Sequence, residues 1–193
     1  MRKYVNPNND LFVEVDFNAA EIRTLLSLLG KPQPAEDIHQ WNSENIFKGK
    51  VSRSEAKKRT FAWLYNPRSR SKDLEAFYKK DIYKKFYSSG QIHTPFNRSI
   101  KVSEEKALNY LIQSTSSDLT LEQADKIRLL LKGRNSFIKF LMHDSVVLDV
   151  DKSDLPMMEL LYDTFKKTRF GNYVVNVRHG TDFSNLGSLK WKT

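Results

Sequence analysis

The sequence predicts an α+β fold, a single sheet domain into which helices are inserted over about residues 31–93. Three observations predict it. Residues 11–17 alternate as a strand does and are followed at once by a helical apolar stripe, while residues 31–93 combine a turn-rich break with helical patterns. The second half holds a long helical pattern, a hairpin, a helix and a strand. The expected order is β-α, inserted helices, α, β-β, α, β.

The first strand is predicted at "LFVEVDF", where apolar residues share one face and the last polar residue is an acid, Asp16. The helix after it spans "NAAEIRTLLSLLG", with Asn18 as the expected N-cap and Gly30 as the residue that stops it. Its apolar stripe consists of Ile22, Leu25, Leu26 and Leu29. A strand followed directly by a helix is therefore expected.

The inserted segment begins with the turn-rich "KPQPAED". A basic, exposed helix is predicted over "SRSEAKKRTFAWLYNP", because Ser52 and Glu55 form a capping box and Asn66-Pro67 ends the pattern. Residues 74–87 carry aromatic and charged residues at helical spacing, and "SSGQIHTPFNRSIKV" predicts a turn with a short extended pair.

The second half starts with a helical pattern from about Ser103 to Lys132, which the polar "QSTSSD" interrupts and Gly133 ends. "SFIKFLMHDSVVLDV" predicts a hairpin that turns at Asp144-Ser145. A helix with Pro156 in its first turn follows at "SDLPMMELLYDTFKK", and "NYVVNV" is the last predicted strand.

The charge of the chain favours a partner that carries phosphates or anionic lipid. The 193 residues include 32 Lys and Arg against 23 Asp and Glu, a formal net charge of +9 with a pI of about 9.6. No apolar run is long enough to span a membrane, and "MRKYVNPNND" lacks the apolar core of a signal peptide. We therefore expect an intracellular protein with no membrane partner.

The residue types narrow the possible metal chemistry. The chain has no cysteine, which excludes disulfides, thiolate zinc sites and cysteine nucleophiles. The four histidines show no metal-ligand spacing; they are His39, His93, His143 and His179. Any bound metal is therefore expected to sit on oxygen ligands.

Two acids stand at strand ends, Asp16 after the first strand and Asp144 at the top of the hairpin. If they meet at one edge of the sheet, the two carboxylates can bind hard cations such as Mg²⁺, and a pair of such ions clamps the oxygens of a phosphoryl displacement. The alternative is that Asp144 is a turn residue and that Asp16 favours the dipole of the following helix.

Arg53, Lys57, Phe61 and Tyr65 recur every four residues, so on a helix they share one gradually turning face about 18 Å long. Two cations near a helix start suit the triphosphate of a nucleotide, and two flat rings further along suit its sugar and base. The alternative is a solvated basic helix with two aromatic residues in the core.

Five stretches resemble the family A (DNA polymerase I-like) DNA polymerases. "VDFNAAEIR" resembles motif A of that family, "RSEAKKRTFAWLY" its motif B helix and "HDSVV" its motif C. "TPFNR" and "NYLIQSTSSD" are similar to two further stretches, and all five follow the chain order of the family.

The resemblance implies a fold and an activity. The fold would be a polymerase palm, an antiparallel sheet with helices on one face, at residues 1–30 and 94–193, with a shortened helical fingers subdomain at 31–93. The motif B helix would span about 53–65 and the motif C hairpin about 136–150. The activity would be DNA-directed DNA polymerase, adding dNTPs to the primer of a primer-template DNA with two Mg²⁺ ions, for which Mn²⁺ would be an acceptable substitute.

The resemblance also assigns roles to residues. Asp16 and Asp144 would hold the metal ions together with the backbone carbonyl of Phe17. Lys57 would donate a proton to the pyrophosphate, and Glu21 would exclude a ribose 2′-hydroxyl, although an ordinary first-turn acid is the alternative for Glu21.

The remaining roles concern the nucleotide and the duplex. Arg53 and Lys57 would hold the incoming triphosphate, Phe61 would pack on the sugar, and Tyr65 would guard the template base. The primer-template would be contacted by Arg98, Asn109, Gln113 and His143. For the two amides, a solvated helix surface is the alternative.

The chain departs from the family pattern at four positions. Ala19 stands where the family usually has glutamine, Asn66 where it has glycine, Ser145 where it has glutamate, and Glu105 where it has arginine. None of these changes removes an expected metal ligand or triphosphate cation. They put fidelity, primer grip and finger closure in doubt.

Only palm and fingers are represented, so no thumb or exonuclease domain is expected in this chain. Because phosphate contacts supply most DNA affinity, we expect a second polypeptide to bring the thumb and exonuclease, as in a phage-type split polymerase. An excised fragment of a longer chain, inactive alone, is one alternative. The others are a non-catalytic primer-template-binding subunit and a general basic nucleic-acid binder.

Overall fold

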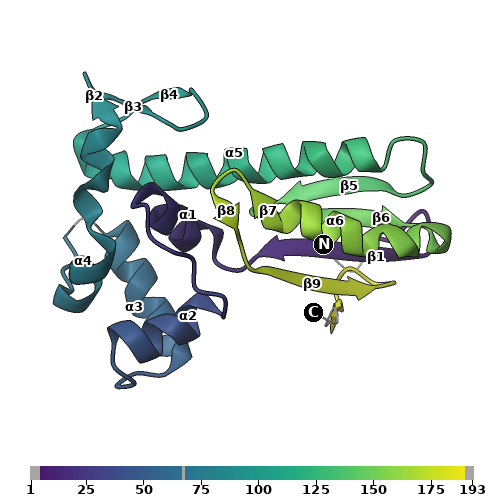
Figure 1. The fold of residues 1–193 in the computed structure, drawn as a ribbon, viewed down its shortest axis with the longest axis horizontal. Coiled ribbons are helices and arrows are strands. Elements are labelled where there is room, and N and C mark those ends of the chain that lie inside the picture. The colour runs from purple at the N-terminus through teal and green to yellow at the C-terminus, as the bar shows by residue number, and fades with distance from the viewer. Residues whose placement is uncertain (1–4, 67, 190–193) are drawn as a thin grey trace. The chain divides into compact units, whose positions relative to one another are not determined.

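The computed structural model describes residues 5–66 and 68–189 (Figure 1), so Pro67 and the outer ends of the two expected palm segments, 1–4 and 190–193, lie outside the described residues. The chain forms two compact units: a first unit of residues 1–18 with 119–193, and a second unit of residues 19–118. These boundaries differ from the expected subdomain boundaries at 30/31 and 93/94. The assignment of palm and fingers stays a prediction.

The first unit is built on a five-stranded antiparallel sheet with the order β10-β9-β1-β6-β5. Its strands are β1 (Leu11–Phe17), β5 (Phe137–Met142), β6 (Ser145–Val150), β9 (Val175–Gly180) and β10 (Gly187–Leu189). The central strand β1 places Asp16 opposite Ser145 of β6 on one side and opposite Asn176 of β9 on the other.

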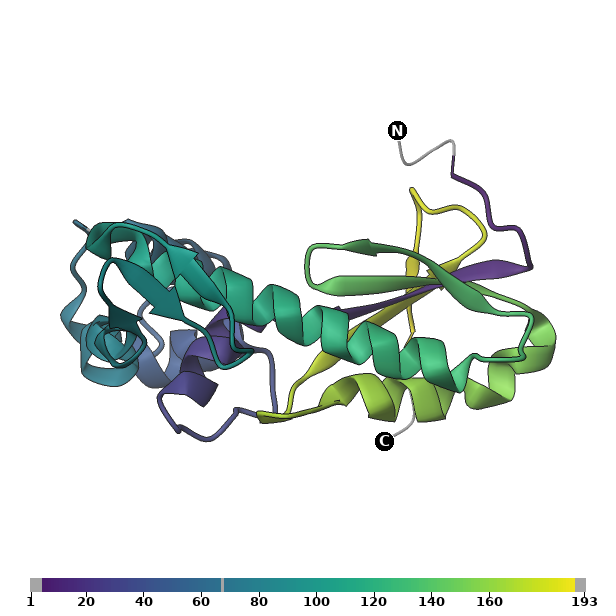
Figure 2. The same ribbon diagram turned by 90° about the horizontal axis from the view of Figure 1, so that it is seen from above.

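Helices cover one side of this sheet. They are α6 (Met158–Lys166) and residues 119–130 of α5 (Ala107–Leu130). The 3₁₀ turn η5 (Lys152–Met157) precedes α6, and a small hairpin of β7 (Lys167–Thr168) and β8 (Gly171–Asn172) follows it. Figure 2 shows α6 and this part of α5 along the same side of the strands. The Phe165 ring of α6 stacks on the Phe17 ring of β1 with centroids 4.2 Å apart. Gln123 of α5 donates to the carbonyls of Thr164 and Phe165 at 2.7 and 2.8 Å. The expected mixture of helices and antiparallel sheet is confirmed.

The two faces of β1 have different surroundings because side chains alternate along a strand. Phe17 and the other odd-numbered residues face the helices. On the opposite face, Phe12 packs edge-on against Phe183 at a centroid distance of 5.7 Å. Glu14 and Asp16 share this second face with Phe12, so the acid at the end of β1 points away from the helices.

The second unit contains several short helices, a small sheet and the first half of α5. Its elements are α1 (Ala20–Leu28), α2 (Ile38–Trp41), the π-helix η2 (Asn42–Ile46), α3 (Arg53–Tyr65), α4 (Lys72–Tyr78), the 3₁₀ segments η3 (Lys80–Lys85) and η4 (Glu104–Lys106), and the strands β2 (Tyr87–Ser88), β3 (Gln91–His93) and β4 (Ser99–Lys101). Its core joins α1, α3, α4 and α5 through buried residues that include Leu25, Trp63, Tyr78 and Ile112.

Four sequence-based expectations about local structure were wrong. Ala19, not Asn18, is the N-cap of α1, with φ 54° and ψ 57°, because the Asn18 amide donates to the Val174 carbonyl at 2.9 Å and so continues the sheet. The hairpin turns at His143-Asp144, and Ser145 already belongs to β6. Pro156 lies in the 3₁₀ turn before α6 rather than in its first α-helical turn. The polar segment "QSTSSD" does not interrupt α5.

Other parts of the fold were not foreseen. The sequence analysis predicted neither α2 with η2 nor the strand β10.

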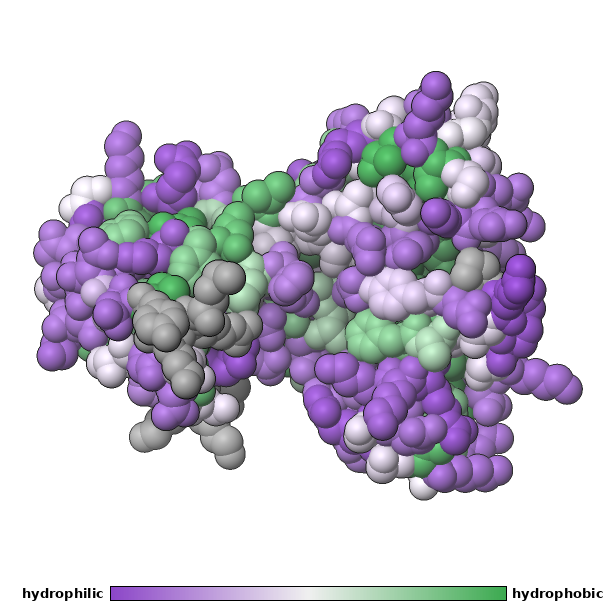
Figure 3. All heavy atoms as spheres, turned by 180° about the vertical axis from the view of Figure 1, so that it is seen from behind, coloured by the Kyte–Doolittle hydropathy of each residue, from purple (hydrophilic) through white to green (hydrophobic). Residues whose placement is uncertain are grey.

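On the face shown in Figure 3, hydrophilic side chains predominate and apolar side chains gather in small separate groups. Within the described part of the chain, no helix is both long and apolar enough to cross a membrane.

Candidate active site

The backbone brings Asp16 and Asp144 together at one end of the central strand. Asp144 occupies the two-residue turn between β5 and β6, in which His143 has a φ of 55°. The Phe17 amide donates to the Asp144 carbonyl at 3.3 Å, which ties this turn to the end of β1. Phe17 is 1% exposed, so the packing of its side chain against the helices fixes the backbone that links Asp16 to the Asp144 turn.

Burial and a neighbouring like charge both act on the Asp16 carboxyl group. Burial and the neighbouring Asp144 carboxylate raise the pKa of Asp16 from 3.8 to about 6. Asn176 of β9 lowers the pKa of Asp16 by donating a hydrogen bond of 3.4 Å to its Oδ2. Asp16 therefore sits where its negative charge lacks enough compensation from the described residues.

The pair fits a hard divalent cation. Two neighbouring carboxylates are stabilised when a cation lies between them, and Mg²⁺ typically binds one or two carboxylates and completes its coordination with water and substrate phosphates. Among the described residues, no group of three or more His, Cys, Asp or Glu side chains could hold a metal ion. The two carboxylates of Asp16 and Asp144 match the number that Mg²⁺ typically takes from a protein.

A buried acid lies beside the pair. Glu14 is 2% exposed and is two residues before Asp16 on the same face of β1. Arg178 of β9 forms an ion pair with Glu14 Oε2 at 2.7 Å, and the Ser145 hydroxyl donates to Glu14 Oε1 at 3.1 Å. The sequence analysis singled out neither Glu14 nor Arg178, because their proximity depends on strand register.

The second unit holds the four residues expected to bind the nucleotide on helix α3. The capping box is confirmed, since the Ser52 hydroxyl accepts from the Glu55 amide at 3.2 Å and α3 begins at Arg53. Arg53 is engaged within the protein: its Nε and Nη2 donate to the two oxygens of Asp37 at 2.9 and 2.7 Å. Lys57, one turn further, is exposed.

Asp37 connects this ion pair to a second helix start. It is the N-cap of α2, and its Oδ1 accepts from the amides of His39 and Gln40 at 3.0 and 2.9 Å. Buried Arg23 holds the preceding loop by donating to the carbonyls of Pro34 and Glu36, both at 2.8 Å. The amino ends of α2 and α3 are therefore fixed next to one another.

Two stacked rings continue the face of α3. Phe61 and Tyr65 have centroids 5.8 Å apart and an interplanar angle of 4°. The ring of His39 lies 5.5 Å from that of Phe61, is 3% exposed, and leaves its Nδ1 without a hydrogen-bond partner in the described structure. Burial lowers the pKa of His39 to about 4, so the ring is neutral at pH 7. The sequence analysis considered His39 only as a metal ligand and missed this contact.

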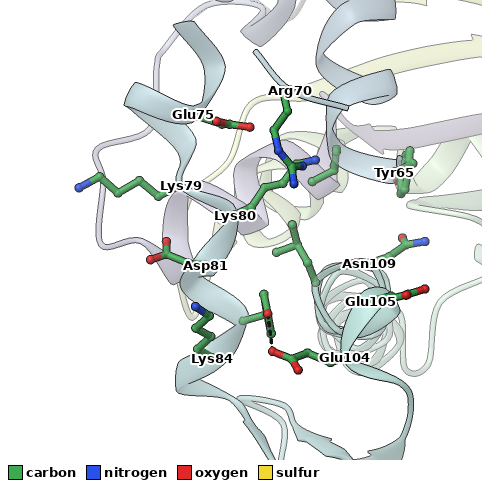
Figure 4. Close-up of a pocket in the computed structure, with 13 residues that line it drawn as sticks. Tyr65, Arg70, Glu75, Lys79, Lys80, Asp81, Lys84, Glu104, Glu105 and Asn109 are labelled. Atoms are coloured by element: carbon green, nitrogen blue, oxygen red, sulfur yellow. Dashed lines mark hydrogen bonds between the residues drawn. The ribbon is translucent and has the colours of Figure 1, made fainter. Parts of the chain in front are cut away.

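A cavity of about 630 Å³ lies within the second unit, beside the end of α3 (Figure 4). Tyr65 and Asn109 lie on one side of it, with Glu105, while Arg70 and Lys80 project from the other. Its wall carries both signs of charge; the cations are Arg70, Lys79, Lys80 and Lys84, and the acids are Glu75, Asp81, Glu104 and Glu105. This mixture does not favour an anion such as a triphosphate over other ligands.

The other expected site residues are distributed over both units. Arg98 follows Asn97 in the β3–β4 turn and forms an ion pair with Asp118 of α5 at 2.7 Å. Gln113 is exposed on α5, one turn after Asn109, whose buried Oδ1 has no partner in the described structure. Glu21 lies in the first turn of α1, and His143 is exposed in the turn of the acid pair.

The expected site residues are thus divided between the two units. Asp16, Phe17, His143 and Asp144 belong to the first unit, and the rest belong to the second: Glu21, Arg53, Lys57, Phe61, Tyr65, Arg98, Asn109 and Gln113. Their individual roles stay predictions.

Comparison with known proteins gives a structural relative. No family model matches the chain, and no curated protein matches it in sequence. Among solved structures, it is similar to the POL domain of Pol1 from M. smegmatis in complex with DNA primer-template and dNTP, with a TM-score of 0.79 and 16% sequence identity. The similarity covers 94% of this chain and 42% of that chain. At this identity the likeness shows the fold alone, which is similar to that of a polymerase domain.

Proposed function

We propose that this chain is a DNA-directed DNA polymerase that extends a primer with dNTPs. The observation that carries the proposal is the convergence of Asp16 and Asp144 at one end of β1, in a fold similar to a polymerase domain that binds primer-template DNA and dNTP. The net charge of +9 and the motif resemblance to family A polymerases support it.

The proposed chemistry is nucleotidyl transfer with two Mg²⁺ ions. When bound, Mg²⁺ lowers the pKa of the primer 3′-hydroxyl and neutralises the departing pyrophosphate. Asp16, Asp144 and the Phe17 carbonyl would hold the cations. The 3′-hydroxyl loses its proton to solvent, and its oxygen forms a bond to the α-phosphorus while the bond from that phosphorus to pyrophosphate breaks. Lys57 donates a proton to the pyrophosphate.

The residues of the second unit select and position the nucleotide. Arg53 and Lys57 bind the triphosphate, Phe61 packs on its sugar, and Tyr65 guards the template base. Glu21 excludes a 2′-hydroxyl. The chain itself mostly positions the reactants, as is usual for phosphoryl transfer.

Part of the machinery is proposed to lie elsewhere. The chain spans 42% of the length of the polymerase chain that it matches. A second polypeptide would supply a thumb and an exonuclease, since phosphate contacts provide most of the affinity for DNA. Co-purification from the native host tests it.

Primer extension tests the catalytic role. We expect Asp144→Asn to lower the rate of single-nucleotide extension by more than about 100-fold, since even residues that only orient a metal ligand contribute about 10–100-fold. Asp125→Asn is the matched control, because Asp125 is an exposed acid of the same unit that pairs only with Arg128 in the described structure. If Asp144→Asn extends a primer as fast as the parent, the protein is not this enzyme.

The alternative is a non-catalytic subunit that binds primer-template for a partner. The observation on its side is the pairing of Arg53 with Asp37, which a bound triphosphate would have to displace. A non-catalytic subunit would bind primer-template in a mobility-shift assay, and its partner's extension rate would be unchanged by Asp144→Asn.

A further inference from the structure

The buried glutamate beside the acid pair is the feature of the molecule that the proposed chemistry leaves unused. A glutamate that is 2% exposed within a strand is costly unless it is paired and hydrogen-bonded. Both neighbouring strands supply a partner for Glu14: Arg178 comes from β9 and Ser145 from β6. Such a network is expected to hold its members in one arrangement.

Strand geometry places this network next to the candidate metal ligands. Glu14 and Asp16 point to the same face of β1 and are separated by about 6.7 Å along the strand. Arg178 is directly opposite Glu14, whereas Ser145 is directly opposite Asp16 and reaches Glu14 diagonally. The network therefore spans the three central strands where the acid pair lies.

Ser145 links Glu14 to the turn that carries Asp144. It is the residue immediately after Asp144 and is 1% exposed. Its hydroxyl lies 2.9 Å from the Met142 carbonyl, across the turn, and 3.1 Å from Glu14 Oε1. Because a hydroxyl has one proton and two lone pairs, it donates to one of these oxygens at a time, and both contacts restrict where the turn can move.

The Asp144 backbone is thus held from two directions. On one side, the Phe17 amide donates to its carbonyl at 3.3 Å. On the other, Ser145 is anchored to Glu14, which Arg178 in turn holds at 2.7 Å. Arg178 also offsets part of the charge of Glu14, which would otherwise add to the repulsion that raises the pKa of Asp16.

We propose that Glu14 is a positioning residue, which holds the Asp144 turn at the spacing from Asp16 that a divalent cation requires. This inference rests on the proposed function. Glu14 acts through Ser145 and is not itself a metal ligand, in agreement with the absence of any three-residue ligand group among the described residues. Ser145 occupies the position at which the sequence analysis found serine in place of the family's glutamate.

The test measures Mn²⁺ binding to the whole chain from the electron paramagnetic resonance signal of free Mn²⁺. We expect Glu14→Ala to weaken Mn²⁺ binding about tenfold, within the range that residues orienting a metal ligand contribute. Glu14→Gln keeps an acceptor for Ser145 and should stay within about threefold of the parent. If the glutamine variant loses as much affinity as the alanine variant, Glu14 acts through its charge or as a ligand, and the positioning role is wrong.

A matched control separates positioning from stability. Asp149 is also a fully buried acid on this sheet, and it accepts from the amides of Asn8 and Asn9 at 2.7 and 2.8 Å and from Lys139 at 3.1 Å. Asp149→Asn should lower the melting temperature without weakening Mn²⁺ binding. An equal loss of binding in Asp149→Asn and Glu14→Ala would overturn the inference.

Two further variants keep the result decisive. Ser145→Ala removes the same contact from its other end, is a small change, and should also weaken Mn²⁺ binding about tenfold; it carries the test if Glu14→Ala does not fold. Asp144→Asn should abolish the binding. If Asp144→Asn binds Mn²⁺ as tightly as the parent does, the proposed metal site is wrong. Loss of binding in Asp144→Asn but not in Glu14→Ala or Ser145→Ala overturns only the positioning role.

Discussion

The acid pair of the first unit and the basic face of α3 in the second unit are held in different ways. Asp16 and Asp144 are brought together by the register of β1 with β6, across a sequence separation of more than one hundred residues. Arg53, Lys57, Phe61 and Tyr65 are aligned by a single helix, and the ion pair from Asp37 to Arg53 spans only 16 residues. One site therefore depends on tertiary structure and the other mainly on local structure.

The two regions also differ in how far their side chains are buried. The acid pair is supported by Glu14 and Ser145, which are 2% and 1% exposed, whereas the Arg53 side chain is 50% exposed. A buried network allows few alternative positions, but an exposed cation changes partners at little cost. The difference indicates that substitutions near the acid pair should alter geometry and metal binding, while those on the α3 face should alter nucleotide affinity.

The largest expected effect concerns the buried side of α3, which packs in the core and supports the exposed basic face. Trp63 is 1% exposed and lies in the core of the second unit. Trp63→Ala should lower the free energy of unfolding by about 3–5 kcal/mol, the usual cost of removing a large buried aromatic residue. Lys58→Ala, on the exposed side of the same helix, should change it by less than about 0.5 kcal/mol. Urea denaturation followed by circular dichroism measures both, and similar values for the two variants would contradict the division of α3 into two faces.

The next effect concerns Lys57, which should act on the nucleotide without touching the metal site. Lys57→Ala should lower kcat/KM for the dNTP by about 10- to 100-fold, because hydrogen bonds to charged groups contribute about 1.5–3 kcal/mol. Its Mn²⁺ affinity should equal that of the parent. Lys58→Ala again serves as the control, since Lys58 is an exposed neighbour outside the four-residue repeat. A drop in Mn²⁺ affinity for Lys57→Ala would mean that the two regions do not act separately.

Local patterns were sufficient to predict the parts of the fold that are built locally. The strand β1, the helix α3 with its Ser52 cap, and the hairpin of β5 and β6 all follow from alternation, helical period or capping residues. The N-cap of α1 was missed because the Asn18 amide pairs with Val174, more than 150 residues away. The three-residue strand β10 is too short to show an alternating pattern.

The same limit applies to the candidate site. The four-residue repeat on α3 is visible in the sequence, and the two strand-end acids could be proposed as a pair. The supporting residues could not, since Glu14, Ser145 and Arg178 meet only through the registers of β1 with β6 and β9. Asp37 was missed because a spacing of 16 residues from Arg53 matches no helical or strand period. The continuous α5 was missed because the burial of Thr115 and Ser116 depends on tertiary packing.

The acid pair should give metal binding a marked pH dependence. Asp16 has a raised pKa of about 6, so a proton competes with the cation, and Mn²⁺ affinity should be about tenfold weaker at pH 5 than at pH 7. Without metal, the sign is reversed: the folded state holds this proton more tightly, so its contribution to the free energy of unfolding is full below pH 3.8 and is lost as the pH rises through about 6.

The neutral His39 of the second unit has the opposite effect on how the free energy of unfolding depends on pH. Its pKa is lowered from 6.5 to about 4, so its contribution to the free energy of unfolding grows as the pH rises between these values. The difference in unfolding free energy between the parent and Asp16→Asn isolates the aspartate, because both proteins contain His39. That difference should change in favour of Asp16→Asn between pH 4 and pH 6 in metal-free buffer. A difference that is constant over this range would contradict the raised pKa.

The smallest expected effect concerns the ion pair between Asp37 and Arg53. Asp37→Asn keeps a good N-cap for α2, since asparagine and aspartate cap helices about equally well, but it releases Arg53 from a charged partner. The surface at the start of α3 then gains one net positive charge, and its affinity for inorganic pyrophosphate should rise by up to about fivefold, the size expected from an exposed pair worth about 0.2–1 kcal/mol.

Isothermal titration calorimetry with pyrophosphate measures this change, and the gain should shrink as salt is added because exposed charges are screened. Glu55→Gln is the matched control: it removes an exposed acid on the same helix that pairs with Arg59 at 2.8 Å, away from the expected triphosphate cations. A larger gain for Asp37→Asn than for Glu55→Gln would show that Asp37 restrains Arg53 specifically. A loss of pyrophosphate affinity in Asp37→Asn would instead mean that the pair orients the guanidinium for phosphate, and that the α3 face is preorganised as the acid pair is.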